Sequence, residues 1–116
     1  MPRQFAVIGL GNFGSQLAAE LTRRGAEVLA IDEREEAVDD LRDHVTHTVV
    51  LDATDDQALA EQRVAEMDAV VVSFGSDFEA ALLTVSVLRQ IGVKRIIVRA
   101  TTVRHERILE TLGVDE

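Results

Sequence analysis

The sequence predicts an α/β fold in which helices cover both faces of one parallel sheet. Five short apolar runs alternate along the chain with segments that have the 3.6-residue periodicity of amphipathic helices. The first run leads directly into Gly9-x-Gly11-x-x-Gly14, the strand–turn–helix signature of a dinucleotide-binding fold. Right-handed crossovers then give a Rossmann-like, doubly wound sheet with strand order 3-2-1-4-5, and the ligand crevice is expected between strands one and four.

Composition limits the classes of function. The chain has 116 residues, of which 47% are hydrophobic, enough for one domain with its own core. It has no cysteine, which excludes disulfides and thiolate metal sites. The formal net charge of −9 argues against a nucleic-acid partner and against an anionic membrane surface, because both require clustered lysine and arginine. No apolar run approaches the roughly 20 residues of a membrane span, so direct membrane insertion is not expected.

The glycine motif predicts a phosphate site. Gly9 permits a sharp turn, Gly11 lets a pyrophosphate approach the backbone, and Gly14 lets the next helix pack closely on its strand. That helix is predicted to begin at Asn12 and Phe13, so its free N–H groups and its positive dipole end point to the same place. An anionic phosphate suits that position.

The second strand is predicted to end in an acid that binds ribose. The apolar run 28–31 follows a helix stop at Gly25 and ends in Asp32. Asp32 follows the motif at close to the interval of about 20 residues at which such folds place the acceptor for a ribose diol. The alternative is a helix cap or a solvated acid. A carboxylate there disfavours the 2′-phosphate of NADP, although Arg34 is near enough to offset this effect.

The third strand, expected at 48–51 after a helix at 34–43, ends at Asp52, Ala53 and Thr54. An adenine edge can be bound at this strand end, with Asp52 accepting a hydrogen bond from the exocyclic amine. The alternative is an ordinary loop acid. Helix caps are predicted at three further places: Thr54 with Gln57, Ser76 with Glu79, and Thr101 or Thr102.

The fourth strand, 69–72, is followed by a loop of Ser73, Phe74 and Gly75 at the predicted ligand edge. The helix expected at 80–91 is apolar on two sides, and only one of them can face the sheet. The other side packs either inside the subunit or against another subunit, and we favour a subunit interface. The two stripes are Ala81, Leu82, Val85 and Leu88, and Ala80, Leu83, Val87 and Ile91.

The fifth strand, 96–98, ends in Arg99, a cation at the same sheet edge as the glycine loop. The alternative for Arg99 is an ion pair on the rim. A last helix is expected to close at Gly113, and residues 114–116 would begin a sixth strand. This pattern predicts a domain, residues 1–116, excised from a longer protein.

Few residues are suited to catalysis. His44 and His47 are expected at the edge of the sheet opposite to the ligand, and His105 falls inside the last helix. The chain contains no tyrosine, which removes the Tyr-and-Lys machinery of short-chain dehydrogenases. We therefore expect binding rather than catalysis and no metal site. The alternative is the cofactor-binding half of an NAD-dependent oxidoreductase that a second domain completes.

The chain resembles the KTN or RCK N-terminal domain, a TrkA-N-like Rossmann domain, of the Ktr and Trk potassium-transport regulators. The resemblance covers nearly the whole chain in the family's order. It is carried by segments 4–14, 27–32, 52–54, 99–100 and 105–113.

The resemblance implies a cytoplasmic regulatory domain that binds ATP, ADP or NAD(H) and alters the conformation of a ring to gate a membrane potassium channel or transporter. It implies a homodimer or an octameric ring, peripheral to the membrane through its transporter partner. In the Ktr branch an arginine that reaches the terminal phosphates often stands at the position of Asn12. The resemblance assigns phosphates to Gly9, Gly11, Gly14 and Arg99, the ribose to Asp32 and Arg34, and adenine to Asp52, Ala53 and Thr54.

Overall fold

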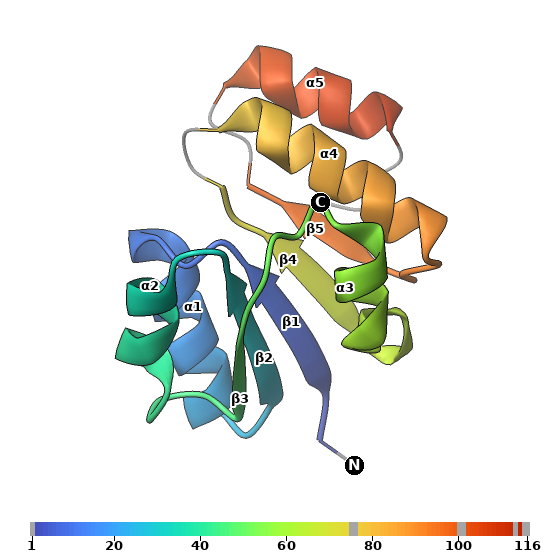
Figure 1. The fold of residues 1–116 in the computed structure, drawn as a ribbon. Coiled ribbons are helices and arrows are strands. Elements are labelled where there is room, and N and C mark those ends of the chain that lie inside the picture. The colour runs from blue at the N-terminus through green and yellow to red at the C-terminus, as the bar shows by residue number, and fades with distance from the viewer. Residues whose placement is uncertain (1, 75–76, 100–101, 113, 115–116) are drawn as a thin grey trace.

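The computed structural model describes residues 2–74, 77–99, 102–112 and 114. Its centre is a five-stranded parallel sheet with the order β3-β2-β1-β4-β5, between two layers of helices (Figure 1). The predicted Rossmann-like fold and strand order are therefore confirmed. The strands are β1 (Gln4–Ile8), β2 (Glu27–Asp32), β3 (His47–Val50), β4 (Ala69–Val72) and β5 (Ile96–Val98). The helices are α1 (Asn12–Arg23), α2 (Glu35–Leu41), α3 (Asp56–Glu61), the short 3₁₀ helix η1 (Val64–Glu66), α4 (Phe78–Gln90) and α5 (Val103–Thr111).

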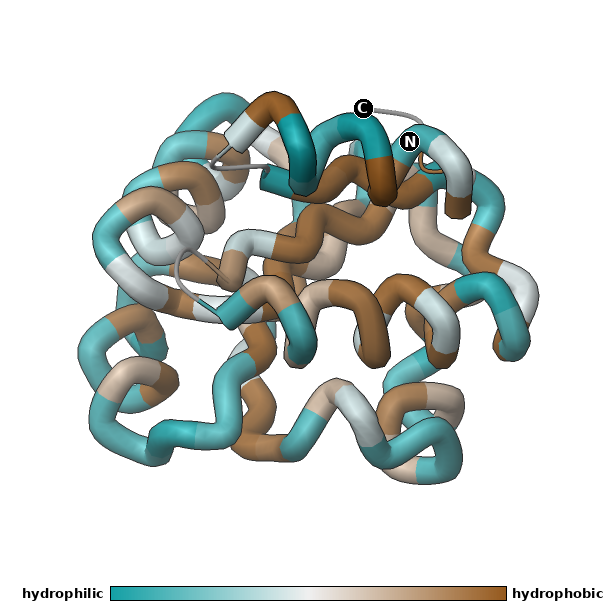
Figure 2. Tube along the Cα trace, turned by 90° about the horizontal axis from the view of Figure 1, so that it is seen from above, coloured by the Kyte–Doolittle hydropathy of each residue, from teal (hydrophilic) through white to brown (hydrophobic). Residues whose placement is uncertain are grey.

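Successive side chains of the central strands supply two separate cores, because side chains alternate between the faces of a sheet. Ala6 and Ile8 of β1 pack in the core beneath α3, α4 and α5, whereas Val7 packs in the core beneath α1 and α2. Hydrophobic segments run through the middle of the molecule and hydrophilic segments lie on the outer helices (Figure 2). Burial on both faces explains why the strands are continuous apolar runs in the sequence.

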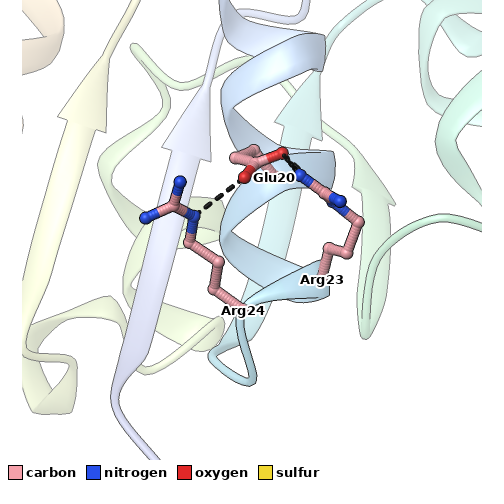
Figure 3. Close-up of polar contacts among 3 residues, drawn as sticks. All are labelled: Glu20, Arg23 and Arg24. Carbon is pink, nitrogen blue, oxygen red and sulfur yellow. Dashed lines mark hydrogen bonds and ion pairs between the residues drawn. The ribbon is translucent and has the colours of Figure 1, made fainter.

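Helix α1 begins and ends where the glycines predict. Its N-cap is Gly11, and after the last turn Gly25 adopts a positive φ of 98°, the conformation expected just past a helix end. In the last turn, Arg23 and Arg24 both form ion pairs with Glu20 (Figure 3). Because both arginine side chains are largely exposed, these pairs add little stability.

Helix α2 is shorter than predicted. It covers Glu35–Leu41 rather than 34–43. Arg34 is the extended N-cap because its backbone N–H donates a hydrogen bond to Asp32 at 2.8 Å. An acid such as Asp43 is also unfavourable at a helix C-terminus, where the dipole is negative.

The predicted cap of α3 is wrong. Asp55, not Thr54, is the N-cap, and its Oδ1 accepts a hydrogen bond from the backbone N–H of Ala58 at 3.1 Å. The Thr54 hydroxyl instead donates to Asp52 Oδ1 at 2.7 Å. Because that hydroxyl is already engaged, the chain turns one residue further before the helix begins, and the capping box with Gln57 does not form.

The predicted cap of α4 is also wrong, whereas that of α5 is confirmed. Asp77 caps α4, accepting a hydrogen bond from the N–H of Ala80 at 3.0 Å. The predicted cap, Ser76, lies outside the described residues. Aspartate and serine are equally good N-caps, so the sequence could not separate these neighbours. At α5, the Thr102 hydroxyl oxygen accepts a hydrogen bond from the N–H of His105 at 3.1 Å.

Helix α5 lies beside α4 (Figure 1), and the rings of Phe78 and His105 stack at a centroid distance of 3.7 Å. Within the second apolar stripe of α4, Val87 and Ile91 pack partly against the core, whereas Leu83 remains 51% exposed. Most of that stripe is thus covered inside the chain.

The predicted sixth strand falls on residues 114–116, of which the structure describes only Val114. This residue is outside any strand and packs against the core. The expected stop at Gly113 lies outside the described residues.

Candidate functional site

A cavity of about 890 Å³ lies at the carboxyl ends of β1 and β4, where the strand order reverses. Ligands of doubly wound sheets bind at this point, and the volume is in the range of small-molecule sites. The cavity brings together eight predicted site residues: Gly9, Gly11, Asn12, Phe13, Asp32, Arg34, Phe74 and Arg99. It is also lined by Leu10, Gln16, Glu33, Ser73, Asp77 and Ala80.

The three glycines have distinct surroundings. Gly9 adopts a φ of 95°, and its N–H donates to the Ile31 carbonyl at 2.9 Å, which makes the sharp turn at the end of β1. A Cβ on Gly14 would lie 1.9 Å from the Gly9 carbonyl oxygen, so the close approach of α1 to the turn requires glycine there. A Cβ on Gly11 would meet no atom within 4 Å. Gly11 therefore faces open space on the cavity side.

The first turn of α1 opens onto this cavity. Its N-cap, Gly11, has no side chain that could accept hydrogen bonds from the first N–H groups, and no acidic residue occupies the first turn. Within the described part of the chain, the first N–H groups of the helix have no side-chain cap, and they and the positive end of the helix dipole face the cavity. This arrangement is suited to an anion such as phosphate.

Asp32 joins the glycine loop to the start of α2. Its side chain is only 7% exposed, and its Oδ2 accepts a hydrogen bond from the Leu10 N–H at 2.7 Å. Its Oδ1 accepts from the backbone N–H of Arg34 at 2.8 Å. The Arg34 guanidinium adds two longer hydrogen bonds of 3.2 and 3.3 Å. The carboxylate thus has a fixed position at the cavity wall.

The charge of Asp32 is maintained by these donors. Burial alone would raise the pKa of its carboxyl. Hydrogen bonds from the Arg34 side chain, the Arg34 N–H and the Leu10 N–H outweigh that effect and hold the pKa of Asp32 below its ordinary value. At neutral pH the site therefore presents a charged acceptor beside the glycine loop.

Arg99 packs on Phe13 at the mouth of the cavity. The guanidinium carbon lies 4.9 Å from the ring centroid, which is a cation–π contact. Among the residues that the structure describes, Arg99 forms no ion pair, so the predicted alternative of a rim ion pair is not found there. Its positive charge lies at the mouth of the cavity that the glycine loop lines.

The end of β3 is built differently. Asp52 is exposed, and its Oδ1 accepts hydrogen bonds from the N–H and the hydroxyl of Thr54 at 2.9 and 2.7 Å. Both hydrogen bonds lower the pKa of Asp52, and the bond from the Thr54 hydroxyl has the larger effect. Neither these residues nor buried Ala53 belongs to the described cavity lining. Their contact with adenine stays a prediction, and Gly75 lies outside the described residues.

Sequence reasoning placed Ser73 in the loop at the ligand edge without giving it a role, and it assigned Asp77 no place in the site. Ser73 follows β4 directly and lines the cavity, as does Asp77, the cap of α4. The available signal was position, since both lie just beyond the carboxyl end of a strand at the switch point.

In the parts of the chain that the structure describes, no group of His, Asp or Glu is arranged to hold a metal ion. No helix in those parts is both long and apolar enough to cross a bilayer.

Known proteins similar to this chain identify its family. The model of the TrkA-N domain family matches residues 5–116. The Ktr system potassium uptake protein A of Bacillus subtilis is 38% identical over 113 residues, which cover 97% of this chain and 51% of that protein. The chain thus spans about half the length of the curated relatives it matches.

The solved structures that share the fold include a domain from Archaeoglobus fulgidus and the GsuK channel. The NAD(P)-binding domain of an exopolyphosphatase-related protein from Archaeoglobus fulgidus is 31% identical with a TM-score of 0.86, covering 96% of this chain and 83% of that one. The GsuK channel bound to NAD also has a TM-score of 0.86 but is 16% identical, covering all of this chain and 21% of that one, so it shows the fold alone. The family resemblance predicted from the sequence is confirmed, and the chain belongs to the TrkA-N domain family.

Proposed function

We propose that this domain is the nucleotide-sensing regulatory domain of a potassium channel or transporter, and that it binds ATP, ADP or NAD(H) in the cavity at the β1–β4 switch point. The observation that carries the proposal is the buried, charged Asp32 beside a glycine loop and a helix N-terminus without a side-chain cap. Support comes from the Ktr potassium uptake relatives and from the NAD(P)-binding domain of Archaeoglobus fulgidus.

The proposed position of the ligand follows from the charges around the cavity and from the open space beside Gly11. The phosphates lie over Gly11 and the first turn of α1, where a Cβ would meet no atom, and Arg99 offsets their charge from the cavity mouth. The ribose hydroxyls donate to Asp32. They displace the guanidinium of Arg34, because its bonds of 3.2 and 3.3 Å are longer than those from the backbone N–H groups. The adenine extends toward Asp52, Ala53 and Thr54.

Regulation requires that the ligand bind two conformations with different affinity. Asp77 and Ala80 line the cavity at the beginning of α4, so a ligand can act directly on this helix. Farther along α4 and on α5, apolar side chains are exposed, and we propose that they form the contact in a homodimer or ring. These side chains are Leu83, Ile108 and Leu112.

In this proposal, residues 1–116 are the nucleotide-binding domain of a longer protein, as the matched region is about half of its relatives. The protein acts in the cytoplasm, attached to a membrane transporter, and catalyses no reaction itself. The alternative function, half of an NAD-dependent oxidoreductase, predicts that the full-length protein oxidises NADH with a small carbonyl substrate. A spectrophotometric assay of NADH oxidation separates the two functions.

Isothermal titration with ATP, ADP, NAD and NADH tests binding, and we expect a stoichiometry near one for at least one of them. Asp32→Ala should weaken that binding by about 1–3 kcal/mol, because the ribose donors lose their buried acceptor. Asp40→Ala is the control, since it removes the same charge from an exposed position on α2. Failure of all four nucleotides to bind would contradict the proposal, and equal affinity of wild type and Asp32→Ala would contradict the ribose assignment.

Regulation needs a separate test on the full-length protein. Small-angle scattering with ATP, ADP and NADH should give at least two subunit arrangements. A single arrangement with all three ligands would contradict the switching role while leaving nucleotide binding intact.

A further inference from the structure

Ser73 lines the cavity beside the glycine loop. It is the first residue after β4 and is only 4% exposed. Its backbone N–H donates a hydrogen bond to the Ile8 carbonyl at 2.8 Å, which holds the residue against the end of β1. Its place at the switch point is therefore set by the sheet itself.

Ser73 packs against the first and third glycines of the motif, with its carbonyl near Gly9 and its hydroxyl near Gly14. A Cβ on Gly9 would be 3.1 Å from the Ser73 carbonyl, and a Cβ on Gly14 would be 3.3 Å from Ser73 Oγ. Glycine at both positions leaves the space that the serine side chain borders. Ser73 and Gly9 both line the cavity, so the serine stands next to the proposed ligand.

Ser73 Oγ is buried and finds no hydrogen-bond partner among residues 2–74, 77–99, 102–112 and 114. Buried hydroxyls nearly always have a partner, so a buried hydroxyl without one at a ligand site indicates that a ligand completes it. Thr84 Oγ1 in α4 is likewise buried and has no partner in the same described ranges. Thr84, however, does not belong to the described cavity lining, so it provides a comparison away from the site.

We propose that Ser73 is a further ligand-binding residue, whose hydroxyl donates a hydrogen bond to the phosphates held at the glycine loop, directly or through one bridging water. A phosphate presents only strong acceptors at this position, and a hydroxyl can rotate its proton toward them. The inference rests on the proposed nucleotide-binding function and adds that Ser73 favours phosphorylated ligands over the bare nucleoside.

The test compares Ser73→Ala with Thr84→Val, since each variant removes one buried hydroxyl. Affinity for ADP is measured by titration calorimetry, and affinity for adenosine by competition against ADP. Ser73→Ala should weaken ADP binding about tenfold, the loss expected for one hydrogen bond to a charged acceptor, and should change adenosine binding less than about twofold. Thr84→Val should change neither affinity. Thermal unfolding without ligand should show both variants as stable as wild type or more so, because each loses an unpartnered polar group.

Unchanged ADP affinity in Ser73→Ala would overturn the inference while the proposed function stands. An equal loss for adenosine and ADP would also overturn it, since Ser73 would then support the shape of the cavity rather than the phosphates. Absence of ADP binding and of every other nucleotide in wild type would instead contradict the proposed function, and this inference with it. Calorimetry on wild type, Ser73→Ala and Thr84→Val with the two ligands therefore separates these outcomes.

Discussion

The ends of β2 and β3 differ although their local sequences are alike. Asp32 ends β2 and Asp52 follows β3 closely, and each accepts a hydrogen bond from the N–H two residues later, at 2.8 and 2.9 Å. Asp32 is 7% exposed and also accepts a bond from Leu10, 22 residues away in sequence. Asp52 is exposed and bonds only within its own turn among the contacts of the described residues. One long-range hydrogen bond thus distinguishes the buried acid in the cavity wall from the exposed acid after β3.

The cause is position in the sheet. Strand β2 lies between β1 and β3, so its end meets the glycine loop that follows β1. Strand β3 lies at the edge of the sheet formed by the described residues, where it pairs with β2. The turn at the end of β2 therefore contacts other parts of the fold, whereas the similar turn after β3 contacts solvent. We expect the two ends to respond very differently to substitution.

The largest effect should come from the glycine loop that Asp32 contacts. Gly14→Ala places a Cβ 1.9 Å from the Gly9 carbonyl oxygen, and backbone must move to accept it. We expect a loss of about 3 kcal/mol in the free energy of unfolding, at the upper end for overpacking, measured by urea denaturation. Gly11→Ala is the control, because its Cβ meets no atom within 4 Å and the change costs only the N-cap preference of about 1 kcal/mol. Equal stability of the two variants would show that the loop is not closely packed on α1.

The next effect compares the two aspartates directly. Asp32→Ala leaves the Leu10 and Arg34 N–H groups without their acceptor and should lower the free energy of unfolding by about 2–3 kcal/mol. Asp52→Ala frees donors that water can reach and should cost about 0.5–1 kcal/mol. Both variants change the net charge equally, so urea denaturation at one pH measures the difference. Equal losses would mean that the long-range bond to Leu10 does not distinguish the two strand ends.

The pH dependence of stability gives a further comparison of Asp32 and Asp52. Burial raises the pKa of Asp32, but its hydrogen bonds lower it further, so the folded-state pKa lies below the ordinary value. Such a group stabilises the fold above its unfolded-state pKa of about 4 and loses that contribution as the pH falls through the folded-state pKa. The stability deficit of Asp32→Asn relative to wild type should therefore be full at about pH 7 and shrink below about pH 4.

Asp52→Asn is the control for this titration. The pKa of Asp52 is also lowered, chiefly by the Thr54 hydroxyl, but its exposure to solvent screens the effect. Thermal unfolding of both variants and wild type across the pH range measures the two deficits. A deficit for Asp52→Asn as large and as pH-dependent as that of Asp32→Asn would remove the distinction between the two sites.

Much of the fold was predictable because each apolar run is short, buried on both faces and followed by a helix, and because crossovers have one hand. The same logic predicted the sheet edge that holds Gly11, Asp32 and Arg99, since all three lie at the carboxyl ends of parallel strands. The position of each strand end can be read from the sequence, and a parallel sheet brings these ends together at one edge.

Two kinds of detail were not predictable from the sequence: which of several local hydrogen bonds forms, and how much space distant residues leave around a side chain. The cap of α3 moved from Thr54 to Asp55 because Asp52 engages the Thr54 hydroxyl first, a competition that spacing alone does not resolve. Ser73 fits at the end of β4 because Gly9 and Gly14 have no side chains that would crowd it. No pattern within the β4 segment encodes that space.

The smallest predicted effect tests whether the end of β3 belongs to the site at all. If Asp52 accepts a hydrogen bond from the exocyclic amine of adenine, Asp52→Ala should weaken ADP binding about threefold, a modest loss because water competes at an exposed acceptor. Inosine diphosphate lacks that amine, so its affinity should be the same in wild type and variant. Titration calorimetry with both nucleotides measures this difference. Equal behaviour of the two ligands would contradict the adenine contact and confine the site to the ends of β1, β2, β4 and β5, where Asp32 alone of the two aspartates binds the nucleotide.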